Sequence, residues 1–298
     1  MTRTQAFLDR LRAGDTLLAD GATGTMLQAL GLEAGLAPEV WVMQQPDQIR
    51  ALHRGYVDAG SDLILTCTFG GTRFRLAEHG LGDQVRAVNR RAAQLAREVA
   101  GEHVFVAGDL GPTGQLLQPL GPLTPEEVAG AYAEQARGLA EGGADFFLIE
   151  TMSDLGEARA AIEGARRAGD LSLICSFSFD THGRTMMGIK PETAAAELGP
   201  LVEGIGANCG QDPAEYVGFM RAMARALSDA APDSILWAKP NAGLPHLVDD
   251  DVVYDATPDD MARVARQLRE AGSQVIGGCC GTTPAHVAAM ATALKREM

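Results

Sequence analysis

The strongest constraint on the fold is a recurring unit in which one short apolar segment precedes one amphipathic helix. Eight segments have the composition of buried strands and run into small or polar residues such as Gly, Asn, Thr or Asp. They cover residues 16–22, 62–70, 104–112, 145–152, 172–179, 204–210, 235–243 and 274–281. Apolar strands that alternate with helices indicate a parallel sheet that helices cover on its faces.

The helical patterns complete this alternation. They cover residues 83–100, 125–141, 154–168, 191–202, 213–229, 258–271 and 284–297. Several begin with proline in the first turn, where the missing N–H would have no intrahelical partner. Eight such units close most naturally into a barrel, and 298 residues suffice for one (β/α)8 domain of about 250 residues.

The sequence therefore predicts an α/β protein, a single-domain (β/α)8 TIM barrel over residues 1–298. An open doubly wound sheet is the alternative architecture. Three irregular stretches, 29–48, 112–123 and 242–257, are expected to be long loops at one rim.

Composition limits the partners. The chain has 25 basic and 39 acidic residues, and its net charge of −14 disfavours binding to nucleic acid or to an anionic membrane. The N-terminal segment lacks the apolar core of a secretory signal, and no later segment offers about 18 uninterrupted apolar residues. We expect a cytoplasmic protein with no nucleic-acid partner and no membrane partner.

The cysteines mark the candidate site. An odd count of five argues against a disulfide framework. Cys209 closes the sixth predicted strand in "GANCG", and Cys279 and Cys280 close the eighth in "GGCCG". In a barrel the active site forms at the C-terminal ends of the strands, and strands six and eight lie roughly 10 Å apart. Three thiolates at these ends can converge on one soft ion, most readily Zn²⁺.

The adjacent cysteines need a sharp turn if both are to reach one ion, and Gly277, Gly278 and Gly281 are predicted to give the backbone that freedom. Three protein ligands leave a fourth position open, as in catalytic zinc sites. A free thiol has a pKa of about 8.5, whereas a metal-bound thiol is deprotonated. The pattern predicts a site that activates a substrate thiol. Cys67 and Cys175 are expected to be ordinary buried side chains.

The segments "DGATGTML", "GANCG" and "GGCCGTTPAH" together resemble the homocysteine S-methyltransferase family, and the resemblance extends over essentially the whole chain. It implies a zinc-dependent barrel that transfers a methyl group to the sulfur of homocysteine. The zinc ligands would be Cys209, Cys279 and Cys280, with Asn241 of "KPNAG" as a candidate fourth ligand when homocysteine is absent.

The same resemblance implies a substrate site. Asp20 and Glu150 match the acidic pair that holds the amino group of homocysteine. The amides that follow the first strand would accept the substrate carboxylate, because the start of a helix favours an anion. The implied substrate-binding residues are Asp20, Gly21, Ala22, Thr23, Gly24, Glu150 and Asn208.

The motifs "GDLGPTG" and "KPNAG" are most similar to the homocysteine-binding module of cobalamin-dependent methionine synthase. Gly70 stands where betaine-using relatives have an aromatic residue of a cation–π cage, and Gly281 stands where relatives that use S-methylmethionine tend to have Arg. Cys67 departs from the module, which usually has Asn there.

No folate, cobalamin or activation segment follows the barrel in this sequence, so the methyl donor is expected to come from outside it. The resemblance implies homocysteine as acceptor and, as donor, a methylated corrinoid on a separate protein or a methylfolate-derived group. Betaine or S-methylmethionine is the alternative donor. An alternative of another class is a non-catalytic zinc or redox module.

Overall fold

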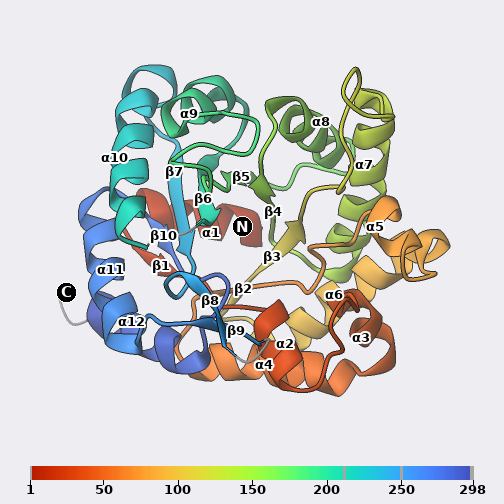
Figure 1. Cartoon of the computed structure of the whole chain (residues 1–298), viewed down its shortest axis with the longest axis horizontal. Coiled ribbons are helices and arrows are strands. Elements are labelled where there is room, and N and C mark those ends of the chain that lie inside the picture. Colours follow the sequence, from red (N-terminus) through yellow and green to blue (C-terminus); the bar gives the residue numbers. More distant parts are fainter. Residues whose placement is uncertain (1, 211–212, 249–250, 296–298) are drawn as a thin grey trace.

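In the computed structural model, which describes residues 2–210, 213–248 and 251–295, eight parallel strands surround a central axis (Figure 1). Their order around the sheet is β1-β10-β7-β6-β5-β4-β3-β2. A parallel bridge between Ala19 and Leu63 links β1 to β2 and closes the ring. The strands are β1 (Leu17–Leu18), β2 (Leu63–Leu65), β3 (Phe105–Leu110), β4 (Phe146–Met152), β5 (Leu173–Phe177), β6 (Gly204–Cys209), β7 (Ile235–Pro240) and β10 (Val275–Ile276). The predicted single-domain TIM barrel is confirmed, and the open sheet was the wrong alternative.

Helices surround the barrel, and every predicted helical pattern forms one. They are η1 (Gly82–Gln84) with α6 (Val85–Ala100), α7 (Pro125–Gly142), α8 (Leu155–Arg166), α9 (Pro191–Leu198) with η2 (Gly199–Leu201), α10 (Pro213–Ala230), α11 (Pro258–Glu270) and α12 (Pro284–Lys295). Thr124 and Thr257 begin α7 and α11 with capping boxes, and proline follows each of them. Residues 296 and 297 of the last predicted helix lie outside the described residues. No described helix combines the length and the apolar character needed to cross a lipid bilayer.

Two of the three predicted rim loops contain regular structure instead. Residues 29–48 include α3 (Pro38–Gln44) and the start of α4 (Pro46–Asp58), and residues 242–257 include the hairpin of β8 (Pro245–Val248) and β9 (Asp251–Tyr254). Helix α3 is too short to show a clear apolar period. The hairpin strands pair only with each other, so no buried face imposes alternation on them. Two further short helices, α2 (Gly24–Ala29) and α5 (Arg73–Ala77), follow β1 and β2.

The first helix, α1 (Arg3–Arg12), closes the N-terminal end of the barrel. Its Phe7 is fully buried and stacks on Phe146, with ring centroids 4.2 Å apart, while Phe105 meets it edge-on at 5.5 Å. The ion pair of Arg3 with the buried Asp145 holds α1 at this end, and Arg97 of α6 pairs with the same carboxylate. Figure 1 shows the N-terminus near the middle of the ring. This end is therefore filled by side chains, which leaves the opposite end for a site.

We predict that Phe7→Ala lowers the free energy of unfolding by about 3–5 kcal/mol, because it leaves a cavity between α1 and the rings of Phe105 and Phe146. Denaturant unfolding followed by circular dichroism measures the change. Phe69→Ala is the control, because Phe69 is 38% exposed and its truncation should cost clearly less. Equal stability of Phe7→Ala and the unmodified protein would contradict the packing of α1 described above.

Candidate active site

Three cysteine sulfurs converge at the C-terminal end of the barrel. Cys209 is the last residue of β6, and Cys279 and Cys280 follow β10. Their sulfur atoms all lie within 4.8 Å of one another, and Sγ of Cys209 is 2.9 Å from Sγ of Cys279. Strand β7 separates β6 from β10, as the sequence predicts. Within the described ranges, this is the one group of three or more His, Cys, Asp or Glu residues close enough to hold an ion.

The backbone around these sulfurs is held in an unusual conformation. Cys209 has a φ of 57°, in the left-handed region that few non-glycine residues adopt. Asn241 ties the two cysteine loops together: its Nδ2 donates to the carbonyl of Gly210 at 2.6 Å, and its Oδ1 accepts from the N–H of Cys280 at 3.0 Å. The amide of Asn241 is thus directed at backbone groups, and its predicted role as a fourth ligand stays a prediction.

The glycines beside the cysteine pair are needed for two different reasons. Gly281 has a φ of 77°, and a Cβ there would lie 2.3 Å from the ring of Tyr254. Gly277 and Gly278 do not have a left-handed φ. A Cβ at Gly277 would lie 2.7 Å from Cβ of Ala19, and one at Gly278 would collide with Thr282. The expectation of turn freedom therefore holds for Gly281, whereas the other two glycines allow close packing.

The three thiols share hydrogen bonds, which makes them unequal acids. Hydrogen bonds from Cys209 and Cys279 hold the pKa of Cys280 well below its ordinary value. Hydrogen bonds to Cys279 and Cys280 raise the pKa of Cys209, and burial adds to this effect. Cys280 is therefore the thiol of the cluster that loses its proton most easily. The set suits a soft divalent ion, whose binding would release the remaining protons.

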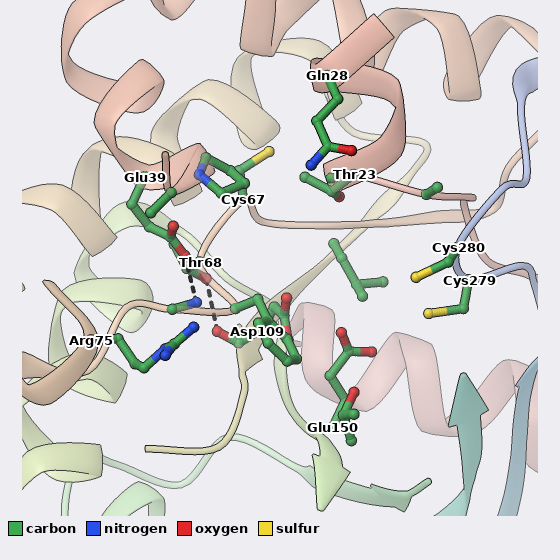
Figure 2. Close-up of a pocket in the computed structure, with 18 of the residues that line it drawn as sticks. Thr23, Gln28, Glu39, Cys67, Thr68, Arg75, Asp109, Glu150, Cys279 and Cys280 are labelled. Carbon is green, nitrogen blue, oxygen red and sulfur yellow. Dashed lines mark hydrogen bonds between the residues drawn. The ribbon is translucent and has the colours of Figure 1, made fainter. Parts of the chain in front are cut away.

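The sulfurs open into a cavity of about 420 Å³ (Figure 2). This volume lies within the range of about 300–1,000 Å³ typical of small-molecule sites. The cavity extends from the cysteines past β3 and β4 to the segment around α3. Its polar and charged lining side chains include Thr23, Gln28, Glu39, Thr68, Arg75, Glu78, His79, Asp109, Glu150, Thr151 and Lys239.

The segment Gly21–Gly24 lines the cavity beside the cysteine loop. A Cβ at Gly21 would lie 2.7 Å from the ring of Tyr56, whose hydroxyl donates to the carbonyl of Ala22. The N–H of Ala22 donates to the carbonyl of Thr282, so this amide is already bonded. Thr23 and Gly24 stand at the start of α2, where the first amides have no intrahelical acceptor. These later amides are the better candidates for an anionic group.

Asp20 forms a buried ion pair. Its Oδ1 lies 2.8 Å from Nζ of Lys239, and its Oδ2 accepts the N–H of Leu65 at 2.8 Å. Burial raises the pKa of Asp20 although Lys239 opposes this. Burial alone would lower the pKa of Lys239, but Asp20 and Glu150 outweigh it and raise this pKa above its ordinary value. Lys239 lines the cavity and was not predicted; the available signal was a lysine that closes an apolar strand in "KPNAG".

Three further acids surround the cavity with oxygens that no described residue satisfies. These atoms are Oε2 of Glu39, Oδ1 of Asp109 and Oε2 of Glu150. Burial raises the pKa of Glu150 to about 8 and that of Glu39 to about 7. The sequence predicted Glu150, but it gave no separate signal for Glu39, which reaches the cavity from the unpredicted helix α3. Asp109 was visible only as part of "GDLGPTG".

The position of Glu39 bears on which methyl donor could enter the cavity. Its Oε1 accepts the N–H of Gly70 at 2.5 Å, and the same oxygen lies 3.2 Å from the place of a Cβ on Gly70. Glu39 therefore occupies the space into which a larger residue at position 70 would extend. Cys67 lines this part of the cavity and is buried, as expected.

Asn208 forms hydrogen bonds with the end of β4. Its Oδ1 accepts the N–H of Thr151 at 2.8 Å, and its Nδ2 donates to Oγ1 of Thr151 at 2.6 Å. Ser176 also donates to this Oδ1. These bonds hold Thr151, which has a φ of 60°, directly after Glu150. Asn208 thus helps to position Glu150. The predicted contact of Asn208 with substrate stays a prediction.

Comparisons of the sequence and of the fold with known proteins indicate the same family. Residues 17–294 match the family model described as homocysteine S-methyltransferase. Methionine synthase of Mycobacterium leprae is 35% identical over 94% of this chain, and that of Mycobacterium tuberculosis is 35% identical over 93%. The chain spans only 24% of the length of either relative.

Among solved structures, the metallated homocysteine methyltransferase MmuM of Escherichia coli superposes with a TM-score of 0.76 at 25% identity. The alignment covers 98% of this chain and 99% of that one. A methyltransferase from Methanosarcina mazei, 13% identical with a TM-score of 0.63, shares the fold. With the family model spanning nearly the whole barrel, the chain belongs to the homocysteine S-methyltransferase family.

Proposed function

We propose that the protein transfers a methyl group to the thiolate of homocysteine, giving methionine, with Zn²⁺ held by Cys209, Cys279 and Cys280. The observation that carries this proposal is the three-sulfur cluster at the end of a buried cavity lined by carboxylates and helix-start amides. The family to which the chain belongs supports the same acceptor. The metallated state of the MmuM structure supports a metal in this family, and the all-sulfur ligand set favours zinc.

The chain's own residues orient the substrate. Zinc bound by the three thiolates would keep the substrate thiol deprotonated at neutral pH. The amides of Thr23 and Gly24 are placed to accept the substrate carboxylate, and Glu150 has a free oxygen for its ammonium group. Holding both ends of a short amino acid fixes its sulfur, and such orientation removes much of the entropic barrier to attack on a methyl group.

The rim of the cavity favours a donor carried by a protein. The connections that follow the strands, at the end of the barrel that holds the cysteines, expose large apolar side chains, and Leu247 is 77% exposed, Met186 75% and Leu120 68%. The set comprises Leu30, Phe69, Leu116, Leu120, Met186, Met187, Leu244, Leu247, Val252 and Val253. Exposed apolar patches of this kind mark interaction surfaces. We propose that a protein-bound methylcorrinoid docks here, which the likeness to methionine synthases supports.

Each of Cys209→Ala, Cys279→Ala and Cys280→Ala should abolish methyl transfer and lower zinc content from about one ion per chain to near zero, because two thiolates leave the ion incompletely bound. Metal analysis of the purified proteins measures the loss. Cys175→Ala is the matched control, since Cys175 lies in β5 away from the cluster and should keep its zinc.

Retained zinc in all three cysteine variants would contradict the ligand assignment. Zinc binding that homocysteine does not perturb, measured in the spectrum of cobalt-substituted protein, would instead favour the non-catalytic zinc or redox module.

Leu247→Glu combined with Met186→Glu should raise KM for a protein-bound methylcorrinoid at least about tenfold, because charges on the rim oppose docking. Methionine formation from free methylcobalamin should not change, since a free donor needs no protein interface. Leu201→Glu is the control: Leu201 is 38% exposed but precedes β6, at the opposite end of the barrel. Transfer from betaine or S-methylmethionine and none from corrinoid would contradict the proposed donor.

A further inference from the structure

We propose that Tyr254, from the β8–β9 hairpin, is a positioning residue of the metal site, and that its hydroxyl donates to the sulfur of Cys280 and so fixes the direction in which that sulfur meets the ion. This inference deepens the proposed function and rests on it. It gives the hairpin, which stands outside the barrel sheet, a part in binding the metal.

The ring of Tyr254 covers the turn that follows the cysteine pair. A Cβ on Gly281 would lie 2.3 Å from Cγ of Tyr254 and 2.4 Å from its Cβ, so a side chain at position 281 would displace the ring. The hydroxyl of the same ring forms a hydrogen bond with the side chain of Cys280. Tyr254 thus contacts two consecutive residues of the loop that carries the cysteines.

Tyr254 reaches this sulfur from outside the space for substrate. Cys280 is among the residues that line the described cavity, whereas Tyr254 is not. A phenol inside the cavity could compete with the substrate thiol for the open position on the ion. From its actual place, the hydroxyl can support the sulfur and leave that position free.

The base of the hairpin is bonded to the cysteine loop. On the side of β8, the N–H of Ala242 donates to the carbonyl of Cys280 at 2.9 Å. On the side of β9, the N–H of Ala256 donates to the carbonyl of Ala242 at 2.9 Å. His286 of α12 accepts a backbone N–H at Nδ1, so its Nε2 carries the proton and donates to the carbonyl of Ala256 at 2.9 Å. These bonds fix the chain two residues after the tyrosine and keep its ring beside the sulfur.

The sulfurs need donors from outside the cluster once an ion is bound. The hydrogen bonds inside the cluster depend on thiol protons, which an incoming ion releases. Two described side chains donate without such a proton: Nδ2 of Asn208 donates to Sγ of Cys209 at 3.6 Å, and the hydroxyl of Tyr254 donates to Cys280. Three cysteine thiolates and a substrate thiolate carry more negative charge than Zn²⁺ neutralises, and hydrogen bonds to sulfur offset part of the excess.

The test is Tyr254→Phe, which removes the hydroxyl and keeps the ring over Gly281. Competition with a chromophoric chelator gives Kd for zinc. We expect this Kd to rise about tenfold, because loss of an outer hydrogen bond typically weakens metal binding by about 10–100-fold. In cobalt-substituted protein, the sulfur-to-cobalt charge-transfer band should move to longer wavelength, since a thiolate that loses a hydrogen bond is a stronger electron donor. A purely structural role of the ring would not move this band.

Two controls isolate the hydroxyl. Tyr132→Phe removes a buried hydroxyl that bonds to the carbonyl of Gly111 and to Glu157, away from the cysteines. Val252→Ala trims an exposed side chain on the same strand as the tyrosine. Both variants should keep the zinc Kd and the cobalt band of the unmodified protein. Unchanged values in Tyr254→Phe, or equal changes in the two controls, would overturn the inference.

The outcome is separable from that of the proposed function. If the unmodified protein binds zinc and transfers the methyl group while Tyr254→Phe keeps its zinc Kd and cobalt band, only this inference is overturned. If the unmodified protein binds no zinc at its cysteines, the proposed function is overturned, and this inference with it.

Discussion

The site depends on the convergence of sulfur atoms from two strands that are not neighbours. Cys209 ends β6, while Cys279 and Cys280 follow β10, and β7 lies between them. Parallel strands in one closed barrel bring these ends to the same rim, and Asn241 bonds to both cysteine loops from the intervening strand. The pairing of β1 with β10 then places Gly21–Gly24 beside the loop of Cys279 and Cys280. The cluster is thus a product of strand order, and sequence proximity supplies only the adjacent pair.

The electrostatics of the cavity favour cations. Four buried carboxyl groups and three partly buried thiols surround it, and in the part of the chain that the structure describes Lys239 is the one buried Lys or Arg. Lys239 pairs with Asp20, and its charge also opposes the effect of burial on the pKa of Asp109 and Glu150. Burial raises the pKa of Glu150 and Glu39, and the opposing effects of Lys239 on Glu150 and of Arg75 on Glu39 are too small to cancel it.

The sequence predicts the parts of this arrangement that periodicity and strand position determine. Eight strands, seven helices and the three cysteines at strand ends follow from patterns within short windows. The pairing of Asp20 with Lys239 joins residues 219 positions apart and depends on which strands are close in space. Neither Asp20 nor Lys239, taken alone in the sequence, indicates this pairing. Helix α3 and the β8–β9 hairpin were missed because a few buried side chains, or pairing between two exposed strands, stabilise them without an extended pattern.

The side chains that line the cavity and those exposed on the loops after the strands both bear on the identity of the methyl donor. A quaternary ammonium donor needs aromatic faces around it, and Phe69 is the one aromatic residue among those that line the described cavity. Glu39 fills the space beside Gly70 where a further ring would stand. The apolar side chains lie outside, on loops from several strands around the mouth. The cavity therefore suits a small, charged amino acid, while the rim suits a large apolar surface.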